Sequence, residues 1–200
     1  MSSPGAGEEF DGSLKGALLV ASPKLGDPNF DRSVVILLDH GDEGALGLVL
    51  NRPTAVPVDE ILEPWQAQAT MAPPGVVFSG GPVSRDAVIG VARARGSVLG
   101  SYEPGAIWRP VLGHMGTVDL SVPPGDQPFA LAGVRLFSGY AGWDGAQLEA
   151  EIAQGAWFVV GALADDLLCT RPADLWHDVL RRQPVPLSML ASYPPHSSVN

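Results

Sequence analysis

The chain has 200 residues, of which 46% are hydrophobic and 17% are charged, and it contains a single cysteine. This composition excludes a highly charged disordered chain. One cysteine excludes an internal disulfide and a zinc site built from several cysteines. The 12 Lys and Arg residues face 22 Asp and Glu residues, which gives a net charge of −10. Because DNA affinity depends on basic groups that neutralise phosphates, we expect no direct binding to nucleic acid.

Both ends of the chain are polar and rich in small residues. Residues 1–12 and residues 192–200 predict disordered tails on either side of one domain over residues 13–191. The start of the chain is acidic, whereas a secretory signal has a basic start and an apolar stretch. No apolar run approaches the roughly 20 residues that span a bilayer. The sequence therefore predicts a cytoplasmic protein with no membrane partner.

Apolar runs predict strands through the first half of the chain. The runs at 14–21, 33–40 and 44–51 are rich in branched residues, and the short glycine-containing link between the last two is typical of a hairpin. From residue 56 to residue 65 the apolar period changes to that of a helix. The buried face of this helix would consist of Val58, Ile61, Leu62 and Trp65.

The second half predicts further strands and two helices. The strands are expected at 75–79, 86–94, 107–111, 117–122, 130–138 and 157–161. Asp144, with Gln147 three residues later, is typical of a capping box that opens a helix, and Gly155 would end it. A last helix is expected over 171–183. Strands outnumber helices and short turns join most of them, which favours a mixed α+β class over regular βαβ alternation.

Motifs that carry known chemistry are missing from the sequence. It has no P-loop, no G-x-G-x-x-G and no G-x-S-x-G pattern. Its four histidines are widely separated and none belongs to a metal-binding pair. We therefore predict no cofactor, no metal and no assignable catalytic residue. Cys169 precedes a predicted helix, where a thiol pKa can fall, but we favour a buried small hydrophobic residue.

Two arginines lie at predicted strand ends, where functional groups commonly gather. Arg32 could bind an anion with two hydrogen bonds. Equally, Asp27 or Asp31 could pair with Arg32 and hold a turn, and we favour this turn. Arg52 follows Asn51 and precedes a proline, which keeps it extended. It could bind a ligand or pair with one of the same acids, and both interpretations stay open.

Glycine-rich segments form two more candidate sites. Gly80 and Gly81 permit positive φ angles and the close approach of a ligand or of another backbone, and free N–H groups there could bind an anion. A plain tight turn explains the same pair, and we favour it. Residues 139–144, which include Tyr140, join a strand to a helix whose N–H groups attract anions. Capping by Asp144 is the explanation we favour for this junction.

These segments, in this order, resemble the YqgE/AlgH family of small bacterial proteins. The matching stretches are 16–35, 44–54, 78–83 and 136–158, with a weaker match at 174–176. The resemblance implies a single α+β domain in which a mixed, mostly antiparallel sheet curls into a partly closed barrel with helices packed outside. It implies no established enzymatic activity. One branch of the family carries a name linked to transcriptional control of an exopolysaccharide.

We therefore expect a non-enzymatic binding or regulatory domain that takes a small anion or a protein partner. The predicted contact residues are Arg32, Asn51, Arg52, Gly80, Gly81 and Tyr140. One alternative is an enzyme of unrecognised type that uses Asp27 or Asp31 with Arg32. The other, suggested by the family name alone, is a transcriptional regulator that contacts DNA. A homo-oligomer is also possible, and exposed tryptophans such as Trp65 or Trp108 would mark its interface.

Overall fold

The computed structural model describes residues 12–98, 100, 103 and 105–193. The two predicted tails lie outside the described residues, apart from Gly12, Ser192 and Tyr193.

Within the described residues, ten strands join in one sheet. They are β1 (Ala17–Ala21), β2 (Val34–Gly41), β3 (Gly44–Val49), β4 (Pro53–Pro57), β5 (Val76–Ser79), β6 (Val83–Ala94), β7 (Trp108–Leu112), β8 (Met115–Val118), β9 (Leu131–Asp144) and β10 (Trp157–Gly161). The helices are α1 (Asp59–Leu62), α2 (Gln66–Thr70), α3 (Gln147–Ala153), α4 (Ala164–Leu167) and α5 (Leu175–Arg181). Four 3₁₀ segments accompany them: η1 (Glu63–Trp65), η2 (Pro124–Asp126), η3 (Pro172–Asp174) and η4 (Leu187–Ser192).

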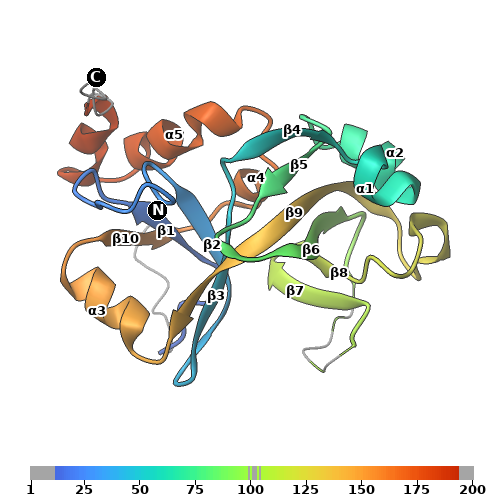
Figure 1. Ribbon diagram of the computed structural model, residues 1–200, viewed down its shortest axis with the longest axis horizontal. Coiled ribbons are helices and arrows are strands. Elements are labelled where there is room, and N and C mark those ends of the chain that lie inside the picture. The colour runs from blue at the N-terminus through green and yellow to red at the C-terminus, as the bar shows by residue number, and fades with distance from the viewer. Residues whose placement is uncertain (1–11, 99, 101–102, 104, 194–200) are drawn as a thin grey trace, which may run out of the picture.

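The long strand β9 connects the two halves of the sheet (Figure 1). The strand order is β10-β1-β2-β3-β9-β6-β8-β7, and β9 pairs with β3 near its end and with β6 before that. These pairings are antiparallel, whereas β5 runs parallel to β9 and antiparallel to β4. The α+β class and the mostly antiparallel sheet, curled into a partly closed barrel with helices outside, are confirmed.

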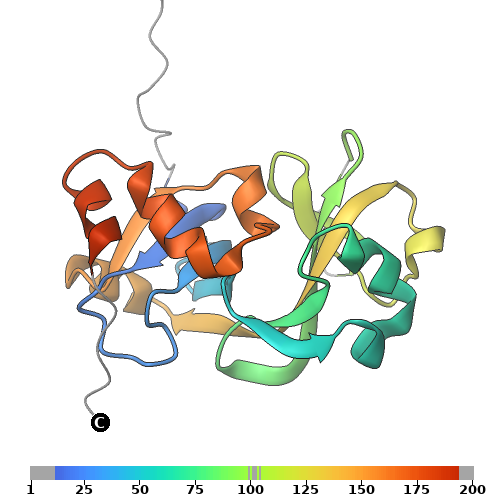
Figure 2. The ribbon, with the colours of Figure 1, turned by 90° about the horizontal axis from the view of Figure 1, so that it is seen from above.

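All five residues of strand β1 are apolar, and both of its faces are buried, as is typical of a strand in the interior of a protein. Leu18 and Val20 belong to the cluster that includes α5, while Leu19 and Ala21 belong to the cluster that includes α3. From above, the orange α5 lies over one half of the molecule, and the teal α1 and α2 lie at the other half (Figure 2). The predicted apolar stripe of α5 is confirmed by the burial of Leu175, Trp176, Val179 and Leu180.

The predicted helix over 56–65 is wrong in part. Its first residues complete β4, α1 covers only Asp59–Leu62, and a 3₁₀ turn follows. Proline lacks the N–H that a continuing α-helix needs, and Pro64 stands at this change. Val58 and Trp65 are buried as predicted, but Ile61 is 48% exposed.

The predicted start of the next helix at Asp144 is also wrong. Asp144 is the last residue of β9, where it pairs with Gly44 of β3, so the strand ladder uses it. Helix α3 follows Ala146, whose backbone is left-handed with φ of 63°. Half of the capping box remains, since Oε1 of Gln147 accepts the N–H of Asp144 at 3.1 Å. The predicted stop is confirmed, because Gly155 follows the helix with φ of 75°.

The two tryptophans named as interface candidates lie in the core. Trp65 and Trp108 are 1% and 4% exposed. They therefore mark no homodimer surface. Among the described residues, no helix has the length and apolar character needed to cross a bilayer.

Candidate functional site

The predicted anion clamp at Arg32 is engaged with the protein itself. Its guanidinium lies 5.0 Å from the centre of the Trp176 ring, and Nη2 donates to the carbonyl of Tyr193 at 2.7 Å. Asp27 holds the turn before it, because Oδ1 accepts the backbone N–H of Asn29 at 2.8 Å. Arg32 therefore links this turn to α5 and the end of the described chain.

The next two candidates support the same turn. Asn51 is buried, accepts the N–H of Val34 at 3.0 Å and donates to the carbonyl of Arg32 at 2.9 Å. Arg52 donates to the carbonyl of Asp31. Burial lowers the pKa of Arg52, and the charge of Asp31 acts against this effect. These hydrogen bonds bring Arg32, Asn51 and Arg52 together as one structural group.

Gly80 and Gly81 let two backbones approach closely. The carbonyl of Gly80 accepts the N–H of Val49 at 2.9 Å, and its N–H donates to the carbonyl of Ser138 at 2.8 Å. A Cβ at Gly80 would overlap the carbonyl oxygen of Gly139, and one at Gly81 would overlap the carbonyl of Tyr140. The glycine pair thus serves the packing of the β5–β6 connection against β9.

None of the six predicted contact residues lines the largest of the described clefts. Polar groups of Arg32, Asn51, Arg52 and Gly80 make the internal contacts above, and Tyr140 packs against the main hydrophobic cluster. Their role in ligand binding stays a prediction.

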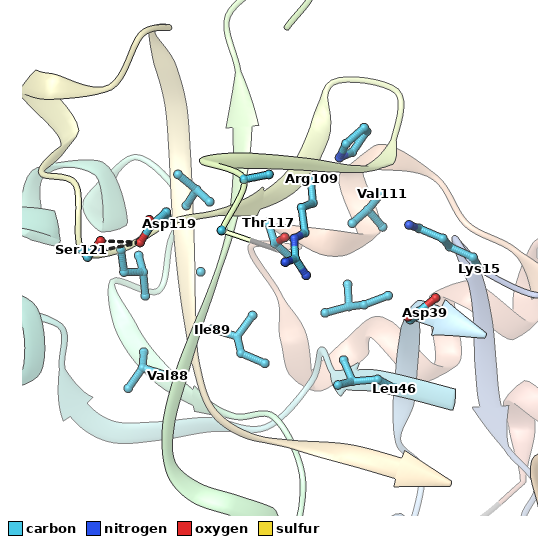
Figure 3. A pocket seen from close by; sticks show the side chains of 17 residues that line it. Lys15, Asp39, Leu46, Val88, Ile89, Arg109, Val111, Thr117, Asp119 and Ser121 are labelled. Carbon is cyan, nitrogen blue, oxygen red and sulfur yellow. Dashed lines mark hydrogen bonds between the residues drawn. The ribbon is translucent and has the colours of Figure 1, made fainter. Parts of the chain in front are cut away.

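This largest cleft, called the main cleft below, has a volume of about 770 Å³. It lies where residues of β2 and β3 face those of β6, β7 and β8 (Figure 3). Its side chains are mainly apolar: Leu38, Leu46, Val88, Ile89, Val111, Val118 and Leu120. The polar side chains are Lys15, Asp39, Arg109, Thr117, Asp119 and Ser121.

Two cationic side chains reach the main cleft from distant parts of the sequence. Arg109 stands in β7 opposite Thr117 of β8, and its guanidinium points into the middle of the cleft (Figure 3). Lys15 enters from the segment before β1, beside Asp39 of β2. Burial lowers the pKa of Lys15, Asp39 raises it, and Arg109 lowers it again. These three charges therefore act on one another inside the cleft.

The position of Lys15 is fixed by the backbone on both sides of it. The N–H of Leu14 donates to Nδ1 of His40 at 3.1 Å, and the N–H of Gly16 donates to the carbonyl of Leu37 at 2.8 Å. Gly16 has φ of 79°, and a Cβ there would lie 3.1 Å from the carbonyl oxygen of Val111. A glycine at this position lets the chain turn past β7 and direct Lys15 into the cleft.

At the other end of the cleft, Asp119 is held by Ser121. Oδ1 of Asp119 accepts the N–H of Ser121 at 2.9 Å and its hydroxyl at 2.7 Å. These two hydrogen bonds lower the pKa of Asp119, so the carboxylate stays ionised. The cleft therefore has a cationic part and a separate anionic end.

Sequence reasoning missed the main cleft. Lys15, Asp39 and Arg109 are single charges in segments that only tertiary pairing brings together. The one available signal was Arg109 followed by Pro110 in a predicted strand, since proline marks an edge strand where side chains can face a cleft. Among the described residues, no group of three or more His, Cys, Asp or Glu side chains is placed to hold a metal ion.

Comparison with known proteins agrees with this architecture. A family model described as AlgH-like matches residues 18–188. The chain belongs to the AlgH-like family. The resemblance to the YqgE/AlgH proteins is thereby confirmed.

Similar proteins cover nearly the whole chain. A UPF0301 protein from Streptomyces coelicolor is 52% identical over 188 residues, which are 94% of this chain and 96% of the relative. A crystal structure of a Corynebacterium diphtheriae protein matches with a TM-score of 0.81 at 29% identity, covering 94% of this chain and 95% of that chain. The solution structure of the AlgH protein from Pseudomonas aeruginosa matches with a TM-score of 0.66 at 28% identity, covering 96% and 100%.

Proposed function

We propose that this protein is a non-enzymatic binding domain that takes a small anionic molecule in the main cleft and acts as a regulator through it. The observation that carries the proposal is the convergence of Lys15 and Arg109 on one concave space. A concave, mainly apolar space with a few convergent polar groups is typical of a site for a small molecule. Two cations among those groups favour an anion.

Recognition at this site is local. The net charge of −10 repels a distant anion, and the field of Lys15 and Arg109 is screened over about 8 Å at physiological salt. We therefore expect selectivity to come from contacts inside the main cleft rather than from fast electrostatic steering.

The alternatives have less support. Asp27 holds a turn, the carbonyl of Asp31 accepts a hydrogen bond from Arg52, and Arg32 packs on Trp176. An enzyme built on these residues has less support because their polar groups make contacts within the protein. Direct DNA contact conflicts with the acidic composition. A protein partner stays an alternative occupant of the main cleft. We also propose that the protein is cytoplasmic, as the sequence predicts.

A thermal-shift screen tests the proposal with inorganic phosphate, acetate, octanoate and AMP as probes. A ligand at about 100 times its Kd stabilises the folded state by about 2.7 kcal/mol, which is a visible shift. We expect at least one probe to raise the melting temperature of the wild type. Arg109→Gln should abolish the shift. Arg181→Gln, at an exposed arginine of α5, should keep it.

The variant Arg52→Gln separates the main cleft from the predicted strand-end site. A shift that survives Arg109→Gln but is lost in Arg52→Gln would place the ligand at the strand-end residues and overturn the assignment to the main cleft. No shift with any probe would overturn the proposal and leave the protein partner as the occupant to seek.

A further inference from the structure

The charges that face the main cleft constrain the ligand. Lys15 and Arg109 bring two positive charges, and Asp39 and Asp119 bring two negative ones. A phosphate dianion would have to satisfy both cations while lying in the field of both carboxylates. A single negative charge at the cationic part faces Asp39, which lies beside Lys15, and is away from Asp119, which Figure 3 places at the opposite end. Such an anion is repelled less by Asp39 than a dianion in the same place would be.

The donor at the centre of the cleft matches a carboxylate. The guanidinium of Arg109 is a planar fork whose N–H groups fit two oxygens of a carboxylate or of a phosphate, so the choice between these two anions rests on the charges and on the apolar surface. It extends from β7 into the space between the Lys15 end and the Asp119 end (Figure 3). Its Nη2 donates to the carbonyl of Glu103 at 3.3 Å, a long hydrogen bond that orients the side chain.

The surface that faces Arg109 across the cleft is apolar. Ile89 of β6 and Leu46 of β3 lie on this side (Figure 3). Both are only half-buried, and Ile89 also packs against the main core cluster, which fixes its position. Covering this surface with an aliphatic chain would remove apolar area from water, which is favourable in proportion to the area.

We propose that the ligand is an aliphatic monocarboxylate whose carboxylate pairs with Arg109 and Lys15 and whose chain covers Ile89 and Leu46. This inference rests on the proposed function, since it names the class of anion that the main cleft takes. It follows from three observations that are independent of one another: the balanced charges, the planar donor and the apolar surface opposite it.

A calorimetric titration with acetate, butyrate, hexanoate and octanoate tests the inference on the full chain. The Kd should fall about two- to fourfold for each added methylene, because the chain covers apolar surface. Inorganic phosphate and 1-octanol should each bind at least about tenfold more weakly than octanoate, since one lacks the chain and the other the charge. Arg109→Gln should weaken octanoate binding about tenfold or more, and Arg181→Gln should leave it unchanged.

Ile89→Thr tests the chain contact separately from the charge. The change keeps the branching at Cβ but removes the Cδ1 methyl and adds a hydroxyl at a half-buried position, and it should reduce the gain per methylene while acetate binding stays the same. The inference is overturned if the Kd does not depend on chain length, or if phosphate binds as tightly as octanoate. In either case, the proposed function still holds if one of the anions binds and its binding requires Arg109. If none of these probes binds and AMP gives no thermal shift, both fail.

Discussion

Arg182 binds the buried carboxylate of Asp166 with two hydrogen bonds, of 2.7 Å from Nη1 to Oδ1 and 2.6 Å from Nη2 to Oδ2. Oδ2 of Asp166 also accepts the N–H of Leu163 at 2.7 Å, at the start of α4. Asp166 is 5% exposed. This ion pair therefore connects α4 to the end of α5 at a site that is largely shielded from water.

Asp166→Ala should destabilise the protein by about 2–4 kcal/mol, because it leaves a partly buried guanidinium and a backbone N–H without their acceptor. Urea unfolding followed by circular dichroism measures the difference. The neighbouring Asp165→Ala is the control, since Asp165 is 89% exposed in its pair with Arg93 and exposed pairs contribute about 0–1 kcal/mol. Equal losses in both variants would contradict this account.

Arg135 is a buried cation with a structural role. Its guanidinium donates to the carbonyls of Pro73 at 2.8 Å and Cys169 at 2.9 Å and lies 4.3 Å from the centre of the Phe78 ring. Burial lowers its pKa to about 10, and Cys169 acts against this. Cys169 packs against the main hydrophobic cluster as predicted, but it is half-buried rather than buried.

Arg135→Lys should cost about 1–3 kcal/mol in the free energy of unfolding, because an ammonium cannot reach the same carbonyls with planar geometry. The measurement is the midpoint of urea unfolding at constant slope. Arg181→Lys, on the exposed side of α5, should change it by less than about 0.5 kcal/mol. If Arg135→Lys were as stable as the wild type, the hydrogen bonds from the guanidinium to the carbonyls would contribute no stability beyond what an ammonium group supplies.

Gly80→Ala tests the close packing of the β5–β6 connection. The added methyl would overlap the carbonyl oxygen of Gly139, and a backbone shift of this kind costs about 1–3 kcal/mol or more. Gly26→Ala is the matched control, because Gly26 has an ordinary φ and open space around its Cβ position. Thermal unfolding should show a clear loss for Gly80→Ala and no loss for Gly26→Ala. A wild-type melting temperature for Gly80→Ala would contradict this account, because it would show that the backbone of the β5–β6 connection shifts at little cost.

Octanoate binding should depend on pH through Lys15. Its pKa lies below the ordinary 10.5 in the free protein, and a bound carboxylate raises it again because opposite charges attract. Binding therefore favours the protonated amine, and affinity should fall as pH rises through this lowered pKa. Calorimetry from neutral pH upward measures the slope. Lys15→Met should remove it, whereas Lys24→Met should keep it, and a wild-type slope in Lys15→Met would exclude this lysine.

Local patterns predict part of this fold well. The β2–β3 hairpin and the buried stripe of α5 follow from apolar spacing alone, and the curled sheet follows from the family resemblance. The prediction of a helix over 56–65 is wrong in part because Pro64 removes a backbone hydrogen-bond donor. The predicted start of α3 is wrong because pairing with β3 holds Asp144 in β9, and no local sequence pattern indicates this pairing.

The candidate site was harder to predict for a physical reason. Arg32, Asn51 and Arg52 were recognised as polar groups at strand ends, but their partners are backbone groups of one turn. Lys15 and Arg109 face one cleft only because the segment before β1 lies against β7, where a Cβ at Gly16 would come 3.1 Å from the carbonyl oxygen of Val111. Such a meeting depends on strand order, which a single sequence does not encode in any local motif.

The most direct measurement of where a ligand binds is a methyl NMR titration with octanoate. The chain has five isoleucines: Ile36, Ile61, Ile89, Ile107 and Ile152. Ile89 lines the main cleft, whereas Ile61 is exposed in α1 and Ile36 lies in the core. Our account predicts a progressive, saturable shift of the Ile89 methyl signal, with the Ile36 and Ile61 signals unchanged, and loss of the effect in Arg109→Gln. An unchanged Ile89 signal at saturating octanoate would contradict it.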